Sequence, residues 1–172
     1  MADIIKTYRQ EVGALRFIGK KYGDGDRVNG DFGAQWGMFF ENAWLPLLEG
    51  LTADPKMTYE DGGATIGLMR WKDGEPFQYW IGMFLPPGTD VPEGFGSVDF
   101  PAGSFGVCWL QGTEDSLFMQ EHRCAVRLME EGYKIIPDRE GACWFFERYV
   151  GSRFTEPDEK GNIILDICHF VE

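Results

Sequence analysis

The chain has 172 residues, enough for one domain with its own core. Its 28 acidic residues outnumber its 16 basic residues, which gives a net charge of −12. This balance argues against nucleic-acid binding, because phosphate contacts need clustered Lys and Arg side chains. A negative field favours cationic ligands instead. The high aromatic content, 15%, fits either an aromatic-lined cavity or ordinary core packing.

The spacing of cysteine and histidine residues predicts no metal site and no disulfide framework. The four cysteines form no C-x-x-C pair, and His122 and His169 have no partner at metal-ligand spacing. We therefore expect reduced thiols, no metal and no cofactor. The longest apolar run, near 79–85, is too short to cross a bilayer, and the N-terminus lacks an apolar signal core. These features predict a cytoplasmic protein without membrane contact.

Apolar periodicity predicts four elements in the first half of the chain. Apolar residues that recur every three or four positions predict the helix, in which Pro46 can introduce a kink. The dipeptide Asp73-Gly74 predicts a tight turn between the last two strands. The expected elements are a strand over 8–22, a helix over 32–51, and strands over 64–72 and 77–85.

The second half repeats this order: a strand over 104–112 that follows a bend at 101–103, a helix over 113–131, and strands over 142–151 and 163–171. The order β-α-β-β thus occurs twice, in halves of about 1–92 and 93–172 within one domain, 1–172. Two such modules predict an α+β fold, with one antiparallel sheet and two helices packed on it. We expect a ligand cleft between the halves.

The strand ACWFFERYVG, 142–151, carries a single acid, Glu147. Strand alternation places Glu147 between Phe145 and Tyr149 on one face, and turns Trp144 and Phe146 to the other face, towards the core. This acid has two interpretations. It pairs with a basic residue or reaches solvent at a sheet edge, or it lies at the bottom of an aromatic pocket that accepts a cation or a proton.

We favour the pocket, and Glu147 and Tyr149 are its first candidates. Four further aromatic residues are candidate walls, with core packing as an equal alternative for each. They are Trp109, Tyr79, Trp36 and Phe40.

Six stretches in order carry a resemblance to a known family: LRFIGKKY, YWIGMFLPPG, FPAGSFGVCWLQG, EEGY, WFFERY and IILDICHF. With them the chain resembles the GyrI-like, or bacterial effector-binding, domain family, as a free-standing member. The resemblance implies two β-α-β-β modules with a hydrophobic groove between them. It also implies that Glu147 contacts cationic or polarised ligands, with Tyr149 beside it.

No helix-turn-helix is expected ahead of the first predicted strand, so we expect no direct contact with DNA. Three functions remain, in order of preference. The first is binding of hydrophobic, often cationic small molecules, for sequestration or sensing. The second, implied by the resemblance, is hydrolysis of cyclopropane-bearing or related toxic molecules, with Glu147 as base or proton shuttle and Tyr149 orienting the substrate. The third is a protein-interaction role such as topoisomerase inhibition; a protein partner or a homodimer stays open.

Overall fold

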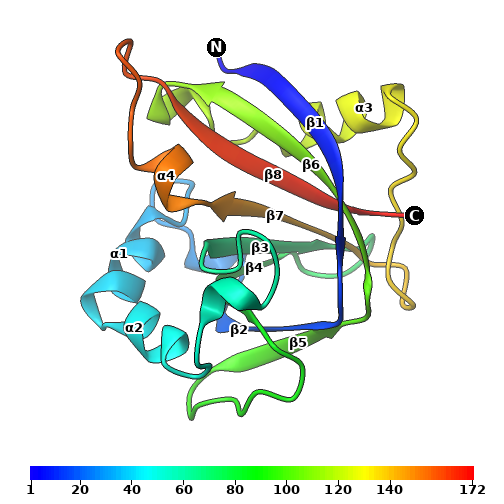
Figure 1. Cartoon of the computed structure of the whole chain (residues 1–172). Coiled ribbons are helices and arrows are strands. Elements are labelled where there is room, and N and C mark those ends of the chain that lie inside the picture. Colours follow the sequence, from blue (N-terminus) through cyan, green and yellow to red (C-terminus); the bar gives the residue numbers. More distant parts are fainter.

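Eight antiparallel strands form one sheet in the order β1-β6-β8-β7-β3-β4-β2-β5 (Figure 1). This computed structural model describes all 172 residues. The α+β fold expected from the sequence is thereby confirmed. The strands are β1 (Asp3–Val12), β2 (Leu15–Tyr22), β3 (Thr65–Trp71), β4 (Gln78–Leu85), β5 (Gly96–Phe100), β6 (Gly103–Gly112), β7 (Cys143–Tyr149) and β8 (Ile163–Val171).

The α-helices are short, and three of them pack on one face of the sheet. Helices α1 and α2 contact β4, whereas α3 contacts β6 and β8. None of the helices is long and apolar enough to cross a membrane. The α-helices are α1 (Gly33–Glu41), α2 (Trp44–Glu49), α3 (Glu121–Glu130) and α4 (Gly151–Phe154).

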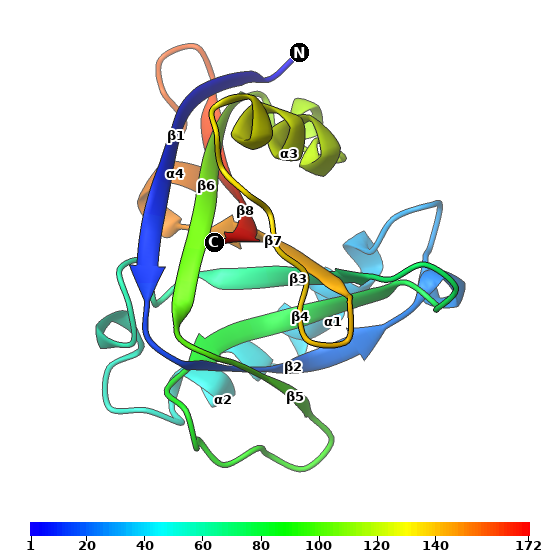
Figure 2. The same cartoon turned by 90° about the vertical axis from the view of Figure 1, so that its right-hand side faces the viewer.

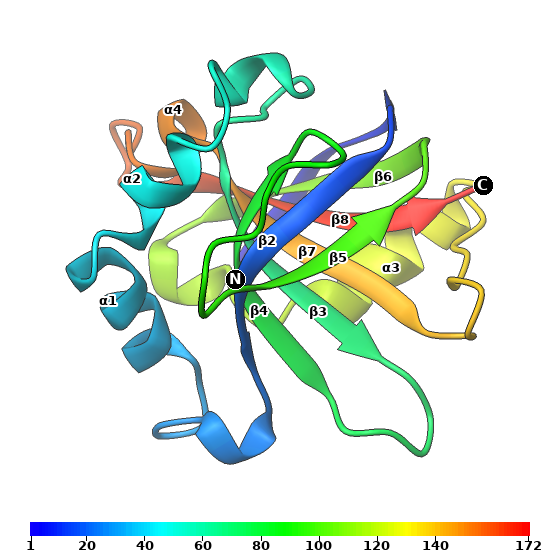
Figure 3. The ribbon, with the colours of Figure 1, turned by 90° about the horizontal axis from the view of Figure 1, so that it is seen from below.

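The strand order is symmetric about the central β7–β3 pair. On one side the order from the centre is β7-β8-β6-β1, and on the other it is β3-β4-β2-β5. Each half takes its edge strand from the other half: β1 precedes β2 but pairs with β6, and β5 precedes β6 but pairs with β2 (Figure 3). The two halves therefore depend on each other to complete the sheet.

The sheet curls strongly, so that its inner face closes on itself. Three strands separate β4 from β6, yet the ring centroids of Phe84 on β4 and Phe105 on β6 lie 6.1 Å apart. Figure 2 shows the two halves of the sheet running at a steep angle to each other. Trp144 and Phe146 belong to this inner core, as alternation predicted. Two further apolar clusters lie on the outer face, one under α1 and α2 and one under α3.

One predicted strand is two strands in the structure, and one strand was missed. The prediction of one strand over 8–22 is wrong, because the chain turns a corner after Val12 and pairs first with β6 and then with β4. The bend predicted at 101–103 separates β5 from β6, because Pro101 has no N–H to donate to a sheet ladder, and the short strand β5 before it was not predicted.

The two predicted helices are also interrupted. The helix expected over 32–51 ends at Glu41 and restarts as α2, because Ala43 adopts a left-handed conformation with φ 55°. Pro46 is tolerated in the first turn of α2, where its missing N–H breaks no helical hydrogen bond. The helix expected over 113–131 starts only at Glu121, after Met119 with φ 63°.

Strand β7 buries a fully partnered arginine on the inner face of the sheet. Arg148 has no exposed surface, and its Nε donates to Oδ2 of Asp166 at 2.8 Å. Its Nη1 donates to Oε1 of Gln10 at 2.7 Å, and its Nη2 donates to the Tyr8 hydroxyl. Arg153 also donates to Asp166, at 2.6 Å. This network joins β1, β7 and β8 across the sheet.

We expect Asp166→Asn to lower the free energy of unfolding by about 3 kcal/mol, because it removes the fully buried counter-charge of Arg148 and leaves only Asp61, 3.4 Å from the guanidinium and partly exposed. Urea unfolding measures the loss. Asp99→Asn is the matched control, since it breaks an exposed pair with Arg16 and should cost less than about 1 kcal/mol. Equal losses for the two variants would contradict a structural role for the buried network.

Candidate functional site

Glu147 lies in the middle of the sheet and is only 5% exposed. Its strand, β7, is paired on both sides, with β3 and β8, so the acid does not reach solvent at an edge. No Lys or Arg side chain forms an ion pair with it. The interpretation of Glu147 as a paired or edge carboxylate is therefore wrong.

A chain of hydrogen bonds links Glu147 to helix α1. The Tyr79 hydroxyl on β4 donates to Oε1 of Glu147 at 2.6 Å. The same hydroxyl accepts a hydrogen bond from Nε1 of Trp36, on the first turns of α1, at 2.9 Å. Strand β4 belongs to one half of the sheet and β7 to the other, so these hydrogen bonds cross the junction between the two halves.

Aromatic rings surround this chain of hydrogen bonds. Phe32 stacks on Tyr79 with 4.3 Å between ring centroids, and Trp36 meets Tyr149 edge to face at 5.0 Å. Phe40, one helical turn after Trp36, stacks on its ring at 6.0 Å and is 53% exposed. The walls thus extend from the buried acid to the molecular surface.

Burial raises the pKa of Glu147 from its ordinary 4.5 to about 7. Hydrogen bonds from Tyr79 and Tyr149 oppose this increase, because they stabilise the charged form. The acid Glu121, at the start of α3, adds to the increase through like-charge repulsion. Near neutral pH the carboxyl group therefore exchanges readily between its neutral and charged forms.

The two tyrosines remain protonated donors. Burial and the nearby Glu147 carboxylate raise the pKa of Tyr79 and of Tyr149 well above the ordinary value of 10. Burial also raises the pKa of Glu121. The site thus combines a desolvated carboxylate, two phenol donors and a second acid, an arrangement that can hold a cation or accept a proton.

The structure brings four of the predicted site residues together and separates one. Glu147, Tyr149, Tyr79 and Trp36 form the centre, and Phe40 lies outside Trp36. Trp109 is directed to the opposite face of the sheet, where its ring packs against Tyr8 and under the guanidinium of Arg153. Its placement follows from the pairing of Trp109 with Asp166 on β8, which no local pattern reveals.

Two residues of the site were missed in the sequence. Phe32 precedes the first residue of α1, where a local pattern shows only a helix start. Glu121 was placed in the middle of a longer predicted helix, whereas it is the first residue of α3. The true start of α3 is marked by the left-handed Met119, and methionine carries no sequence signal for that conformation.

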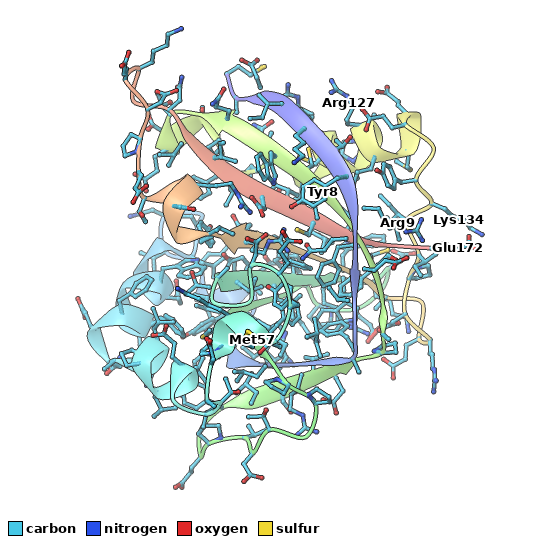
Figure 4. The ribbon with its side chains drawn as sticks, in the orientation of Figure 1. Tyr8, Arg9, Met57, Arg127, Lys134 and Glu172 are labelled. Carbon is cyan, nitrogen blue, oxygen red and sulfur yellow. The ribbon has the colours of Figure 1, made fainter.

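Two surface hollows lie away from this site. One, of about 320 Å³, lies beside the C-terminus and is lined by Arg9, Lys134 and Glu172 (Figure 4). The other, of about 410 Å³, is lined by residues that include Lys21 and Arg70. Neither hollow includes Glu147 or the rings around it.

Several solved structures share this fold, among them the following three. A candidate bacterial transcription regulation protein from Staphylococcus aureus MU50 matches with a TM-score of 0.62 and 14% identity, over 98% of this chain and 99% of that chain. SAV2435 bound to tetraphenylphosphonium matches with a TM-score of 0.64 and 14% identity, over 98% and 94%. An integron cassette protein from Vibrio cholerae matches with a TM-score of 0.51 and 14% identity, over 99% of both chains.

At these identities the likeness concerns the fold alone, and it confirms the fold expected from the resemblance to GyrI-like domains. No protein-family model matches the chain. No curated protein matches its sequence either.

Glu147→Gln is expected to stabilise the protein at pH 8. A raised pKa in the folded state contributes stability below the unfolded pKa of 4.5, and this contribution is lost as the pH rises through about 7. At pH 8 the variant should gain up to about 3 kcal/mol over the wild type, and near pH 4 the difference should vanish. Urea unfolding at the two pH values measures it. Equal stability at pH 8 would mean that the charged acid is not strained by burial.

Proposed function

We propose that the chain binds hydrophobic, cationic small molecules at Glu147. The observation that carries this proposal is a carboxylate that is 5% exposed, has no basic partner and is enclosed by aromatic rings. A charge buried in this way is costly unless something pairs with it. A lipophilic cation would supply the missing charge and would bury its own apolar surface against the rings.

The electrostatics of the chain support the same ligand class. The net charge of −12 attracts cations over the whole surface, and Glu121 adds a second acid that acts on Glu147. Tetraphenylphosphonium, found with the fold neighbour SAV2435, is a cation of this kind and is therefore the first probe. In this proposal the ligand displaces Trp36 and Phe40, which are the wall residues on the surface side of Glu147.

Tetraphenylphosphonium should bind the wild type and quench tryptophan fluorescence, whereas an uncharged triphenylphosphine oxide should bind weakly. Glu147→Gln should weaken cation binding by about 30-fold or more, because it removes one partner of a buried charge pair. Glu159→Gln in the exposed turn before β8 is the control, since it changes the net charge equally and should leave binding unchanged.

Equal affinities of wild type and Glu147→Gln for the cation would overturn the assignment of Glu147. The same samples test the hydrolase alternative. A binder saturates at one ligand per site and returns the ligand unaltered, whereas a hydrolase forms product over time.

Cation binding should depend on pH through Glu147. Because a bound cation favours the charged carboxylate, affinity should be full above pH 8 and should fall towards tenfold per unit below pH 7. Calorimetry in buffers of different ionisation enthalpy should then show a proton released on binding near pH 7. In Glu147→Gln both effects should disappear; if they persist, another group carries the proton.

A further inference from the structure

Strand β3 lies between the two residues that share the central hydrogen bond. Glu147 projects from β7 on one side of β3, and Tyr79 projects from β4 on the other. The residue of β3 directly opposite Glu147 is Gly67. The carboxylate and the phenol therefore reach across β3 and meet above a residue without a side chain.

There is no room for a side chain at this position. A Cβ atom on Gly67 would lie 2.5 Å from Oε1 of Glu147 and 2.5 Å from the hydroxyl oxygen of Tyr79. Both distances are well inside van der Waals contact, and both involve the two atoms that form the hydrogen bond. A methyl group at residue 67 would therefore displace the acid, the phenol or both.

Gly67 differs from Gly19 and Gly82, two other crowded glycines of the sheet, in the kind of atom that crowds it. A Cβ on Gly19 or Gly82 would meet the backbone of a neighbouring strand, which explains those glycines by close chain packing. The nearest atoms to a Cβ on Gly67 belong to the side chains of the site. A glycine inside a central strand costs stability, and it often marks a place where another group approaches closely.

We propose that Gly67 is a positioning residue of the ligand site, because its missing side chain lets the Glu147 carboxylate lie across β3 against the Tyr79 hydroxyl. The inference rests on the proposed function for its ligand, and on the contacts above for its geometry. Gly67 thereby sets both the depth of the carboxylate and its hydrogen-bond partner.

The groups that act on the charge of Glu147 come from three elements. Tyr79 on β4 and Tyr149 on β7 stabilise the charged form by hydrogen bonding, and Glu121 on α3 opposes it. On β8, His169 shares this face of the sheet, but burial lowers its pKa to about 4, so it is neutral at pH 7. Of these, the Tyr79 bond is the one that a side chain at residue 67 would break.

A double-mutant cycle tests the proposal on the full chain with four proteins: wild type, Gly67→Ala, Tyr79→Phe and the double variant. The readout is the titration midpoint of the Glu147 carboxyl group, followed by carbon-13 NMR without ligand. Tyr79→Phe should raise the midpoint by about one pH unit in the wild-type background, because it removes a hydrogen bond to the charged form. In the Gly67→Ala background the same substitution should change nothing, since that bond is already broken.

Tetraphenylphosphonium affinity at pH 8 should follow the same pattern: Gly67→Ala should change it, and adding Tyr79→Phe should not change it further. Gly103→Ala is the control, because a Cβ there has its nearest neighbour at 3.9 Å and should leave both readouts unchanged.

An equal effect of Tyr79→Phe in both backgrounds would overturn the proposal. If Gly67→Ala alone does not fold, recovery of folding in the double variant supports it, since removing the hydroxyl frees the space. Failure of both variants to fold would assign Gly67 to sheet packing and overturn it as well. The midpoint needs no ligand, so absence of tetraphenylphosphonium binding would refute the proposed function and leave the role of Gly67 to be decided by the cycle.

Discussion

A carboxylate buried without a cation is the constraint on which the site depends. The contrast within β7 makes this clear, because Glu147 and Arg148 are adjacent, both buried, and directed to opposite faces. Arg148 is held by Asp166, Gln10 and Tyr8, whereas Glu147 has only hydroxyl partners. The fold can therefore pair a buried charge fully on one face while it leaves the charge on the other face unpaired.

The surrounding structure holds the acid in this unfavourable place. Strand β7 is fixed by β3 and β8 on its two edges, and the inner core packs under it through Phe146. The Arg148 network adds a tie from β7 to β1 and β8. These contacts lie on the inner face and hold β7 in place without any contribution from the Glu147 side chain, which lies on the outer face.

Features of the fold and the site were predictable from the sequence where they depend on neighbouring residues of one strand, and not where they depend on contacts with distant segments. Alternation within β7 correctly placed Glu147 and Tyr149 on one face of the strand and Phe146 on the other, because side chains alternate between the two faces of any strand. The corner after Val12 and the left-handed Ala43 were missed, since both are set by pairing and packing with distant segments. Trp109 was misplaced for the same reason: the face it shares with Asp166 is fixed by the register of β6 on β8.

The duplicated architecture also explains why the site is asymmetric. Gly67 and Glu147 face each other across the central β3–β7 pair, at equivalent positions of the two halves. Acids at both positions would place two like charges directly opposite each other on a buried face, which destabilises a sheet. Only one half can therefore carry the carboxylate. In the other half Gly67, which has no side chain, provides the space for the Glu147 carboxylate. The single site thus arises from the differences between two halves that share one framework.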